Sequence, residues 1–423
     1  MSLPGHPHIA YRNGALHIED CAGAELAQRF GTPLYVYSRG SMLAALAPYQ
    51  RALAGRRHLV CYAVKANPNL SVLQTFARAG CGFDIVSGGE LERVLAAGGD
   101  ASKVVFSGVG KTRREMARAL EVGVRCFNVE SAAELEVLSE VAQAHGQRAP
   151  VSLRVNPNVD AKTHPYISTG LTHNKFGIAH EEALAAYRRA AELPGIAVHG
   201  IDCHIGSQIT EPGPYLDALD KVLDLVETVE AEGIRLTHID FGGGLGITYT
   251  DEAPPAADAL ITALLKRLDE RGHGQRELIL EPGRSLVGNA GVLLTEVLYL
   301  KPSAHKNFCI VDAAMNDLLR PTLYEAVMGI VPCAPRAGAA ERTWDVVGPV
   351  CESGDWLGRD RRLAVQAGDV LAILSAGAYG MSMASHYNTR PKPAEVMVDG
   401  AEAWIVRERE TVADLFAREQ LAR

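Results

Sequence analysis

A short apolar segment followed by a stretch with helical spacing occurs eight times between residues 59 and 284, and this alternation strongly constrains the fold. The stretches between the apolar runs include LSVLQTFARAG and SAAELEVLSEVAQAHG, in which apolar residues recur at helical intervals. Strands that alternate with helices pair in parallel through crossover connections. Eight such units predict a closed (β/α)₈ barrel, whose active site lies where the strands end. The apolar runs are LVCYAV, CGFDIV, KVVFSG, RCFNVE, VSLRVN, VHGIDCHIG, LTHIDFGGG and LILEPGR.

The pattern changes after Leu286, where strand-like runs such as GVLLTEVLYL, FCIVDA and DVLAILSA follow one another without regular helices between them. Near the amino terminus, two short apolar runs flank Asn13 and Gly14, a pair that favours a tight hairpin turn. We therefore expect an α/β protein with a TIM-like barrel over residues 30–286. A β-rich domain is expected to combine residues 1–29 with residues 287–423, and Thr411 is expected to cap a final helix.

The composition is that of an ordinary globular protein. The chain has 423 residues, of which 47% are hydrophobic and 22% charged, enough to form a core in each of two domains. Its 42 basic and 50 acidic residues give a net charge of −8, and no basic block indicates nucleic acid or an anionic membrane. The first residues lack a signal-peptide pattern, and no apolar run approaches the roughly 20 residues of a membrane helix. We expect a cytoplasmic protein that acts on small molecules.

The eight cysteines are scattered along the chain without CxxC pairs. This spacing argues against a zinc site and against a disulfide framework. Most of them are expected to be small core residues.

Chemically distinctive residues follow the predicted strands. Lys65 ends the first strand, although such a lysine on its own is more often a side chain that extends to water. Three glycines, Gly242 to Gly244, follow the seventh strand, and Gly283 lies in a turn after the eighth. Loops after these two strands commonly bind phosphate, and glycine lets backbone amides approach an anion. Either turn alone could be a tight connection, but their joint occurrence favours a phosphate site.

A lysine opposite a phosphate site predicts pyridoxal phosphate, which has both an aldehyde and a phosphate, bound to Lys65 as a Schiff base. Glu281, after the eighth strand, would then keep the pyridine nitrogen protonated, so that the ring can accept electrons. The alternative role of Glu281 is a salt bridge to a barrel arginine. His204, after the sixth strand, could lie flat against the ring, although a lone barrel histidine is more often structural.

A series of ordered motifs spans essentially the whole chain, and through them the sequence resembles the fold-type III pyridoxal-phosphate decarboxylases, and among these the diaminopimelate decarboxylases. The motifs are GTPLYVYS, YAVKAN, FDIVSGGEL, THPYISTGLTHNKFGI, HIGSQ, FGGGLGI, EPGRS, RPTLYEA, CESGD and GAYG. The resemblance implies a head-to-tail homodimer whose active sites lie at the subunit interface. It also implies decarboxylation of meso-2,6-diaminopimelate to L-lysine and carbon dioxide, the last step of lysine biosynthesis.

The resemblance further implies roles for individual residues. Lys65 resembles the Schiff-base lysine, His204 the ring-stacking histidine, and Cys351 the proton donor, which would be supplied with Glu352 to the partner subunit's site. The implied cofactor contacts are Lys65, Asp84, His204, Ser207, Gly242, Gly243, Gly244, Glu281, Gly283, Arg284 and Tyr379. The implied substrate contacts are Arg284, Arg320, Tyr324, Glu352 and Tyr379, and no metal is implied. Without the resemblance, Cys351 would be a buried structural cysteine, and Arg320 with Tyr324 an i, i+4 helix pair.

The implied substrate explains the charges of these residues. Diaminopimelate has an amino-acid group at each end; arginines suit the distal carboxylate through bidentate pairing, and Glu352 suits the distal ammonium. Such a pocket should reject an amine without the distal carboxylate by on the order of 10⁴, which predicts little activity on ornithine or lysine. The sequence leaves open the discrimination between meso and L,L isomers, assembly beyond a dimer, regulation, and the role of the loop at 160–176.

Several alternatives remain at this stage. Decarboxylases of the same fold that act on ornithine, arginine or carboxynorspermidine are the nearest, but EPGRS, RPTLYEA and CESGD favour the diaminopimelate type. Alanine racemase places an arginine at the pyridine nitrogen, where this sequence has Glu281. A cofactor-binding homologue without catalysis is disfavoured by Lys65 and Cys351. A metal-dependent barrel hydrolase is disfavoured because the first strand lacks an HxH pair.

Overall fold

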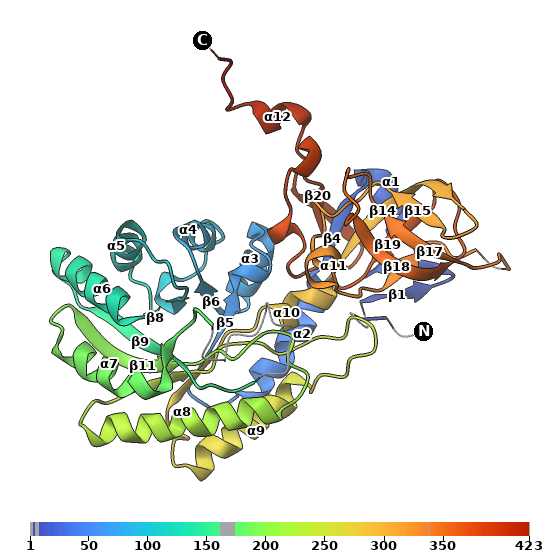
Figure 1. The fold of residues 1–423 in the computed structure, drawn as a ribbon. Coiled ribbons are helices and arrows are strands. Elements are labelled where there is room, and N and C mark those ends of the chain that lie inside the picture. Colours follow the sequence, from blue (N-terminus) through green and yellow to red (C-terminus); the bar gives the residue numbers. More distant parts are fainter. Residues whose placement is uncertain (1–2, 5–7, 161–173, 337, 423) are drawn as a thin grey trace. The chain divides into compact units, whose positions relative to one another are not determined.

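The chain folds into two compact units, which are described separately (Figure 1). The structure is a computed structural model that describes residues 3–4, 8–160, 174–336 and 338–422. The β-rich unit takes in residues 1–44, 248–252 and 286–423, and the barrel unit residues 45–247 and 253–285. Most of the THPYISTGLTHNKFGI motif lies outside the described residues. Among those described, no helix has the length and apolar character that crossing a membrane requires.

Eight parallel strands close into the predicted barrel. They follow one another in the order β9-β11-β12-β13-β5-β6-β7-β8, and β8 pairs with β9 to close the ring. Each of the eight apolar runs overlaps one of these strands, because strands buried on both faces are nearly continuous apolar segments. The predicted fold class is therefore confirmed. The strands are β5 (His58–Ala63), β6 (Gly82–Ile85), β7 (Val104–Phe106), β8 (Cys126–Val129), β9 (Ala149–Asn156), β11 (Ile196–Asp202), β12 (His238–Asp240) and β13 (Glu277–Leu280); a short β10 (Ile178–Ala179) pairs with β9.

Helices surround the barrel strands (Figure 1). Several begin at a hydroxyl residue whose side chain accepts a backbone N–H of the first turn: Ser87 before α4, Thr112 before α5 and Ser131 before α6. These caps fix where each chain segment turns back from the strand exits. The helices are α2 (Arg39–Ala52), α3 (Leu70–Arg78), α4 (Gly88–Ala96), α5 (Arg113–Val122), α6 (Ala132–Ala144), α7 (His180–Glu192), α8 (Gly213–Ala231), α9 (Ala257–Glu270) and the short α10 (Arg284–Val287).

The β-rich unit contains a small amino-terminal sheet and a larger mixed sheet. In the small sheet, the turn between β1 and β2 has positive φ at both Asn13 (51°) and Gly14 (79°), which confirms the predicted hairpin. The larger sheet follows the order β18-β17-β15-β14-β4-β20-β21, while β19 also pairs with β14, and β16 pairs with β19. The strands are β1 (Ile9–Arg12), β2 (Ala15–Ile18), β3 (Cys21–Ala22), β4 (Leu34–Ser38), β14 (Gly291–Lys301), β15 (Phe308–Val311), β16 (Ile330–Pro332), β17 (Arg342–Val347), β18 (Trp356–Leu363), β19 (Val370–Ile373), β20 (Ala394–Asp399) and β21 (Glu402–Arg407).

Three helices also belong to this unit: α1 (Gly23–Phe30), α11 (Arg320–Tyr324) and α12 (Val412–Phe416). Thr411 caps α12 as predicted, and its hydroxyl accepts the N–H of Asp414. The unit's core joins residues from both ends of the chain, among them Leu34, Val292 and Val396.

One boundary differs from the predicted domain ranges. Residues 34–38 form β4, which lies between β14 and β20 in the β-rich sheet, so the barrel unit begins after residue 44 rather than at residue 30. The segment LYVYS is buried along its whole length. An apolar run of this kind fits a buried strand of either unit, and the sequence does not reveal which sheet receives it.

The cysteines behave largely as expected. All eight are free thiols, and six of them are buried. Cys351 is exposed in this chain, so it is not a buried structural cysteine.

Candidate active site

The site begins with a lysine at the end of the first barrel strand. Lys65 lies in a single 3₁₀ turn after β5, and its ammonium is paired with the carboxylate of Asp84 on the neighbouring β6. Asp84 is fully buried, whereas the Lys65 side chain keeps 39% of its surface exposed. The buried Asp84 carboxylate therefore holds the amine of Lys65, whose side chain is partly exposed.

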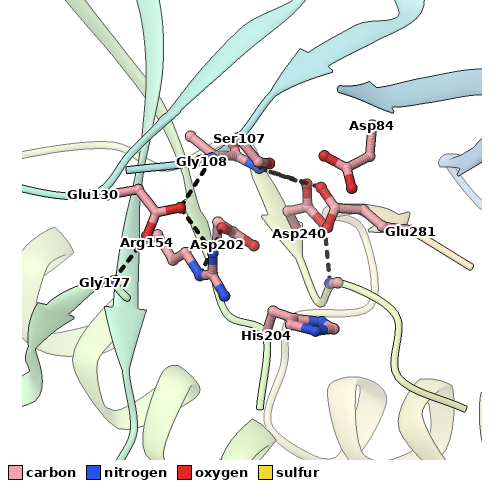
Figure 2. A network of polar contacts seen from close by, with 12 residues as sticks. Asp84, Ser107, Gly108, Glu130, Arg154, Gly177, Asp202, His204, Asp240 and Glu281 are labelled. Atoms are coloured by element: carbon pink, nitrogen blue, oxygen red, sulfur yellow. Dashed lines mark hydrogen bonds and ion pairs between the residues drawn. The ribbon is translucent and has the colours of Figure 1, made fainter. Parts of the chain in front are cut away.

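Three more buried carboxyl groups lie at the ends of β11, β12 and β13. Asp202, Asp240 and Glu281 each have a carboxyl oxygen that lies within 4.8 Å of those of the other two. Figure 2 shows the three side chains. Asn128 on β8 donates its amide N–H to Asp240 Oδ2 and to Glu281 Oε1, each at 3.3 Å. Oxygen ligands at this spacing could also hold a cation. We refer to these three acids and Asp84 as the carboxyl cluster.

Burial controls the protonation of Asp202, Asp240 and Glu281. Desolvation, and then the charge of neighbouring acids, raise the pKa of Glu281 and of Asp202 well above their usual values. Desolvation raises the pKa of Asp240 to about 6, although it accepts the Gly242 N–H. Acids this close share protons, because like charges in a buried site cannot all ionise.

A second polar group connects neighbouring strands on the other side of the site. Glu130 accepts the N–H of Gly108 at 3.0 Å, the N–H of Gly177 at 2.9 Å and a guanidinium N–H of Arg154 at 2.8 Å (Figure 2). Arg154 also lies 3.9 Å from Asp202. Glu130 thus fixes the loops after β7 and β9, and Arg154 brings a positive charge next to Asp202.

His204 follows β11 and contacts the glycine turn. Its Nδ1 accepts the N–H of Gly243 at 3.2 Å. Desolvation, together with the nearby charges of Arg154 and Lys65, lowers the pKa of His204 well below its usual value. The imidazole is therefore neutral, with Nδ1 as the acceptor.

The glycines of this turn are required by close packing between loops. A Cβ on Gly243 would lie 2.2 Å from the Glu281 carbonyl oxygen, and one on Gly244 would lie 2.4 Å from the Gly206 carbonyl oxygen. The N–H groups of Gly242 and Gly243 already donate to Asp240 and His204. The turn is thus shaped by its neighbours after β11 and β13.

Two further residues lie beside it. Arg284, at the start of α10, is buried and donates to the hydroxyl of Ser207 at 2.9 Å. Gly283 packs against β5, where its Cβ would lie 3.0 Å from that of Ala63. An arginine and a hydroxyl next to a glycine turn offer donors to an anion.

Comparison with known proteins identifies the enzyme family to which this chain belongs. The family model described as pyridoxal-dependent decarboxylase, pyridoxal binding domain, matches residues 39–288. The chain belongs to the pyridoxal-dependent decarboxylases. It is 60% identical to the diaminopimelate decarboxylase of Pseudomonas aeruginosa over 98% of this chain and 99% of that one. It is 57% identical to the corresponding Vibrio cholerae protein, over 97% of each chain.

Solved structures agree with this assignment. Diaminopimelate decarboxylase from M. jannaschii, in co-complex with L-lysine, matches with a TM-score of 0.94 and 40% identity, covering 99% of each chain. This decarboxylase is therefore a pyridoxal-phosphate-dependent lyase with the barrel and β-rich fold of its relatives.

The remaining sequence-predicted residues of the decarboxylase lie in its β-rich unit. Arg320, at the start of α11, is buried; its guanidinium lies 5.5 Å from the ring centre of Tyr324 and 4.9 Å from that of Tyr249. Tyr379 adopts a φ of 55°, an uncommon conformation for an aromatic residue. The predicted i, i+4 relation of Arg320 and Tyr324 is thus a stacking contact.

Cys351 and Glu352 are both exposed in the single chain. The Cys351 N–H donates to Asn388 Oδ1 at 2.7 Å, and Asn388 has a positive φ of 56°. The Tyr387 side chain is hydrogen-bonded to Glu352. The turn at 386–389 therefore supports both residues.

Sequence reasoning missed Asn128, Asp202 and Asp240. Asn128 and Asp202 lie within strands that were recognised only by their apolar neighbours. Asp240 had a detectable signal, because an acid two residues before the first glycine of FGGG can accept that glycine's N–H.

Proposed function

We propose that this decarboxylase converts diaminopimelate to L-lysine and carbon dioxide, the last step of lysine biosynthesis, at active sites shared by two subunits. The observation that carries the proposal is the Lys65–Asp84 pair next to the carboxyl cluster at the barrel strand exits. The 60% identity to a diaminopimelate decarboxylase over nearly the whole chain supports the choice of substrate.

The site's composition suits a cationic ring with an anionic tail. Oδ1 of Asp84 and of Asp202 are buried and have no hydrogen-bond partner among the described residues. Unsatisfied buried acceptors within an acidic cluster favour a ligand that brings positive charge and N–H donors. Arg284 and Ser207 offer donors for a phosphate. Pyridoxal phosphate has both features, and its ring supplies the electron sink for loss of carbon dioxide.

Each residue then has a defined task. Lys65 would hold the cofactor through its amine, and Asp84 would keep that amine oriented. Glu281 would hold the protonated ring nitrogen. His204 would contact the ring, and since its imidazole is neutral it would add no repulsive charge to a cationic ring. Cys351 delivers a proton to the substrate Cα after carbon dioxide has left.

The remaining residues are assigned to binding of the substrate. Arg320 and Arg284 would pair with the carboxylates of the substrate, with Tyr324 and Tyr379 beside them, and Glu352 would bind the distal ammonium. The Arg320 guanidinium, stacked on two tyrosine rings, has little freedom to reorient. It can therefore distinguish a substrate that ends in a distal carboxylate from one that lacks this group.

A homodimer accounts for the exposed catalytic candidates. Cys351 and Glu352 are exposed in one chain, and Leu70, Val86 and Val109, which follow three consecutive barrel strands, are exposed apolar side chains. Exposed apolar residues at strand exits suit a protein interface. We propose that the partner subunit supplies Cys351 and Glu352 to each active site.

We also propose that the enzyme acts in the cytoplasm.

Borohydride reduction of the holoenzyme followed by peptide mapping tests the cofactor lysine. The label should appear on Lys65. Lys111 is an internal control: it too lies near the strand exits, but it is buried, and its ammonium already donates to Gly108 O, Asn128 O and Glu134 within 2.8 Å. A label on Lys111 or on another lysine rejects the assignment.

Carbon dioxide release from diaminopimelate, lysine, ornithine and arginine, measured side by side with added cofactor, tests the substrate. We expect kcat/KM for diaminopimelate to exceed that for ornithine by on the order of 10⁴, because the arginines would otherwise be left unpaired. Equal or higher activity on ornithine, lysine or arginine would reject the proposed substrate.

A further inference from the structure

The side chain of Asp240 connects the glycine turn to Glu281. Asp240 is the last residue of β12 and is fully buried. Its Oδ1 accepts the N–H of Gly242 at 3.0 Å, and the Gly242 carbonyl accepts the N–H of Glu281 at 2.6 Å. The Asp240 carboxylate thereby holds Gly242, the residue whose carbonyl accepts the Glu281 N–H.

Asn128 completes the connection from the opposite side of the barrel. Its single amide nitrogen lies 3.3 Å from Asp240 Oδ2, 3.3 Å from Glu281 Oε1 and 3.2 Å from Ser107 Oγ. Carboxyl oxygens of Asp240 and Glu281 lie within 4.8 Å of each other, and both side chains are buried. Two buried carboxyl groups this close cannot both ionise easily, which favours one proton shared between them.

We propose that Asp240 and Asn128 are positioning residues that hold the Glu281 carboxyl at the cofactor's ring nitrogen and make Glu281 and Asp240 share one proton. The inference rests on the proposed role of Glu281. Neither positioning residue needs to touch the ring: Asp240 acts through its hydrogen bond to Gly242 and through its charge, and Asn128 acts by donating to both acids.

The charge of the pair follows from this arrangement. Glu281 and Asp240 together carry one negative charge when they share one proton. That charge, next to the ring nitrogen, favours the protonated ring. Removing the ionisable group of Asp240 leaves Glu281 as the only member of the pair that can hold either the proton or the charge.

The Asp240→Asn variant removes this charge, and it also replaces Oδ2, the acceptor for Asn128, with an NH₂ donor. Its amide oxygen can still accept the Gly242 N–H, while its NH₂ group can donate to Glu281 but cannot share a proton with it. Asp202→Asn is the matched control, because Asp202 is equally buried and acidic but has no hydrogen bond to Gly242, Asn128 or Glu281 in the described structure. Asn128→Ser loosens the pair and leaves both acids in place.

The experiment measures two properties of each holoenzyme: the pH midpoint of the bound cofactor's visible absorbance, and the dissociation constant of pyridoxal phosphate by fluorescence quenching. For Asp240→Asn we expect the midpoint to change by roughly 1–2 pH units, and the dissociation constant to rise by about tenfold. Asn128→Ser should weaken binding by a smaller factor and broaden the titration. Asp202→Asn should move the midpoint by less than half as much as Asp240→Asn.

An unchanged midpoint in Asp240→Asn, or an equal shift in Asp202→Asn, would overturn the positioning role, because the effect would then come from the cluster's total charge. If Asp240→Asn does not fold, as judged by its melting curve, the Asn128→Ser titration decides alone. An Asn128→Ser titration curve identical to that of the wild type then overturns the inference. Wild-type protein that fails to bind the cofactor would instead contradict the proposed function, so the two failures are distinguishable.

Discussion

At the scale of single residues, the carboxyl group of Asp240 links the active site to the stability of the fold. Its pKa rises from its ordinary value to about 6 because burial penalises the charged form. The folded state therefore binds a proton more tightly than the unfolded chain does. By linkage, this contribution to stability is present at low pH and is lost as the pH rises from about 4 through about 6.

The free energy of unfolding of the apoprotein should show this loss. Between pH 5 and pH 7.5 we expect Asp240→Asn to gain stability relative to the wild type by on the order of 2 kcal/mol, because the buried charge no longer forms. Urea unfolding at several pH values, followed by circular dichroism, measures the difference. Parallel pH profiles for the two proteins would show that Asp240 is not the responsible group.

At the scale of elements, the turn after β12 is shaped by the loops that pack against it. Gly242 has a positive φ of 61°, and the missing side chain of Gly243 admits the Glu281 carbonyl. The glycine run thus brings the loops after β11, β12 and β13 together, and this approach places His204 and Glu281 in one site.

Gly243→Ala should therefore damage both fold and site. Its Cβ would lie 2.2 Å from a backbone oxygen that cannot move without displacing Glu281. We expect a loss of roughly 1–3 kcal/mol in unfolding free energy and weaker cofactor binding. Gly110→Ala is the control, since a Cβ there has no atom within 4 Å and should change neither property. Equal behaviour of the two variants in thermal melting and cofactor titration would refute this account.

Sequence reasoning reached the barrel because its strands are apolar on both faces, and it reached Lys65 and Glu281 because they end such strands. It failed for β18, whose segment WLGRDRRL is too polar to predict a strand, and for β16, which has only three residues. It also missed Asn128, because the contact of Asn128 with Asp240 and Glu281 joins positions 112 and 153 residues apart. Such pairings depend on barrel closure, which local patterns do not encode.

At the scale of the whole molecule, the proposed homodimer predicts complementation between inactive variants. Lys65→Ala removes the cofactor lysine, and Cys351→Ala removes a group that the partner is proposed to supply. Mixed dimers would contain one site with both residues intact and one with neither. After co-refolding of equal amounts, we expect roughly a quarter of wild-type activity from random pairing of subunits. Activity equal to the mean of the two separate variants would argue that each chain forms its site alone.

Strand β4 has a consequence for how the chain is made. It is one of the first strands synthesised, yet both strands that flank it, β14 and β20, come from the last third of the sequence. On a ribosome, the intervening barrel segment would emerge and could begin to fold while β4 still lacks its neighbours. A polypeptide chain truncated anywhere before residue 394 would lack β20 and leave β4 with an open edge, a feature that promotes aggregation.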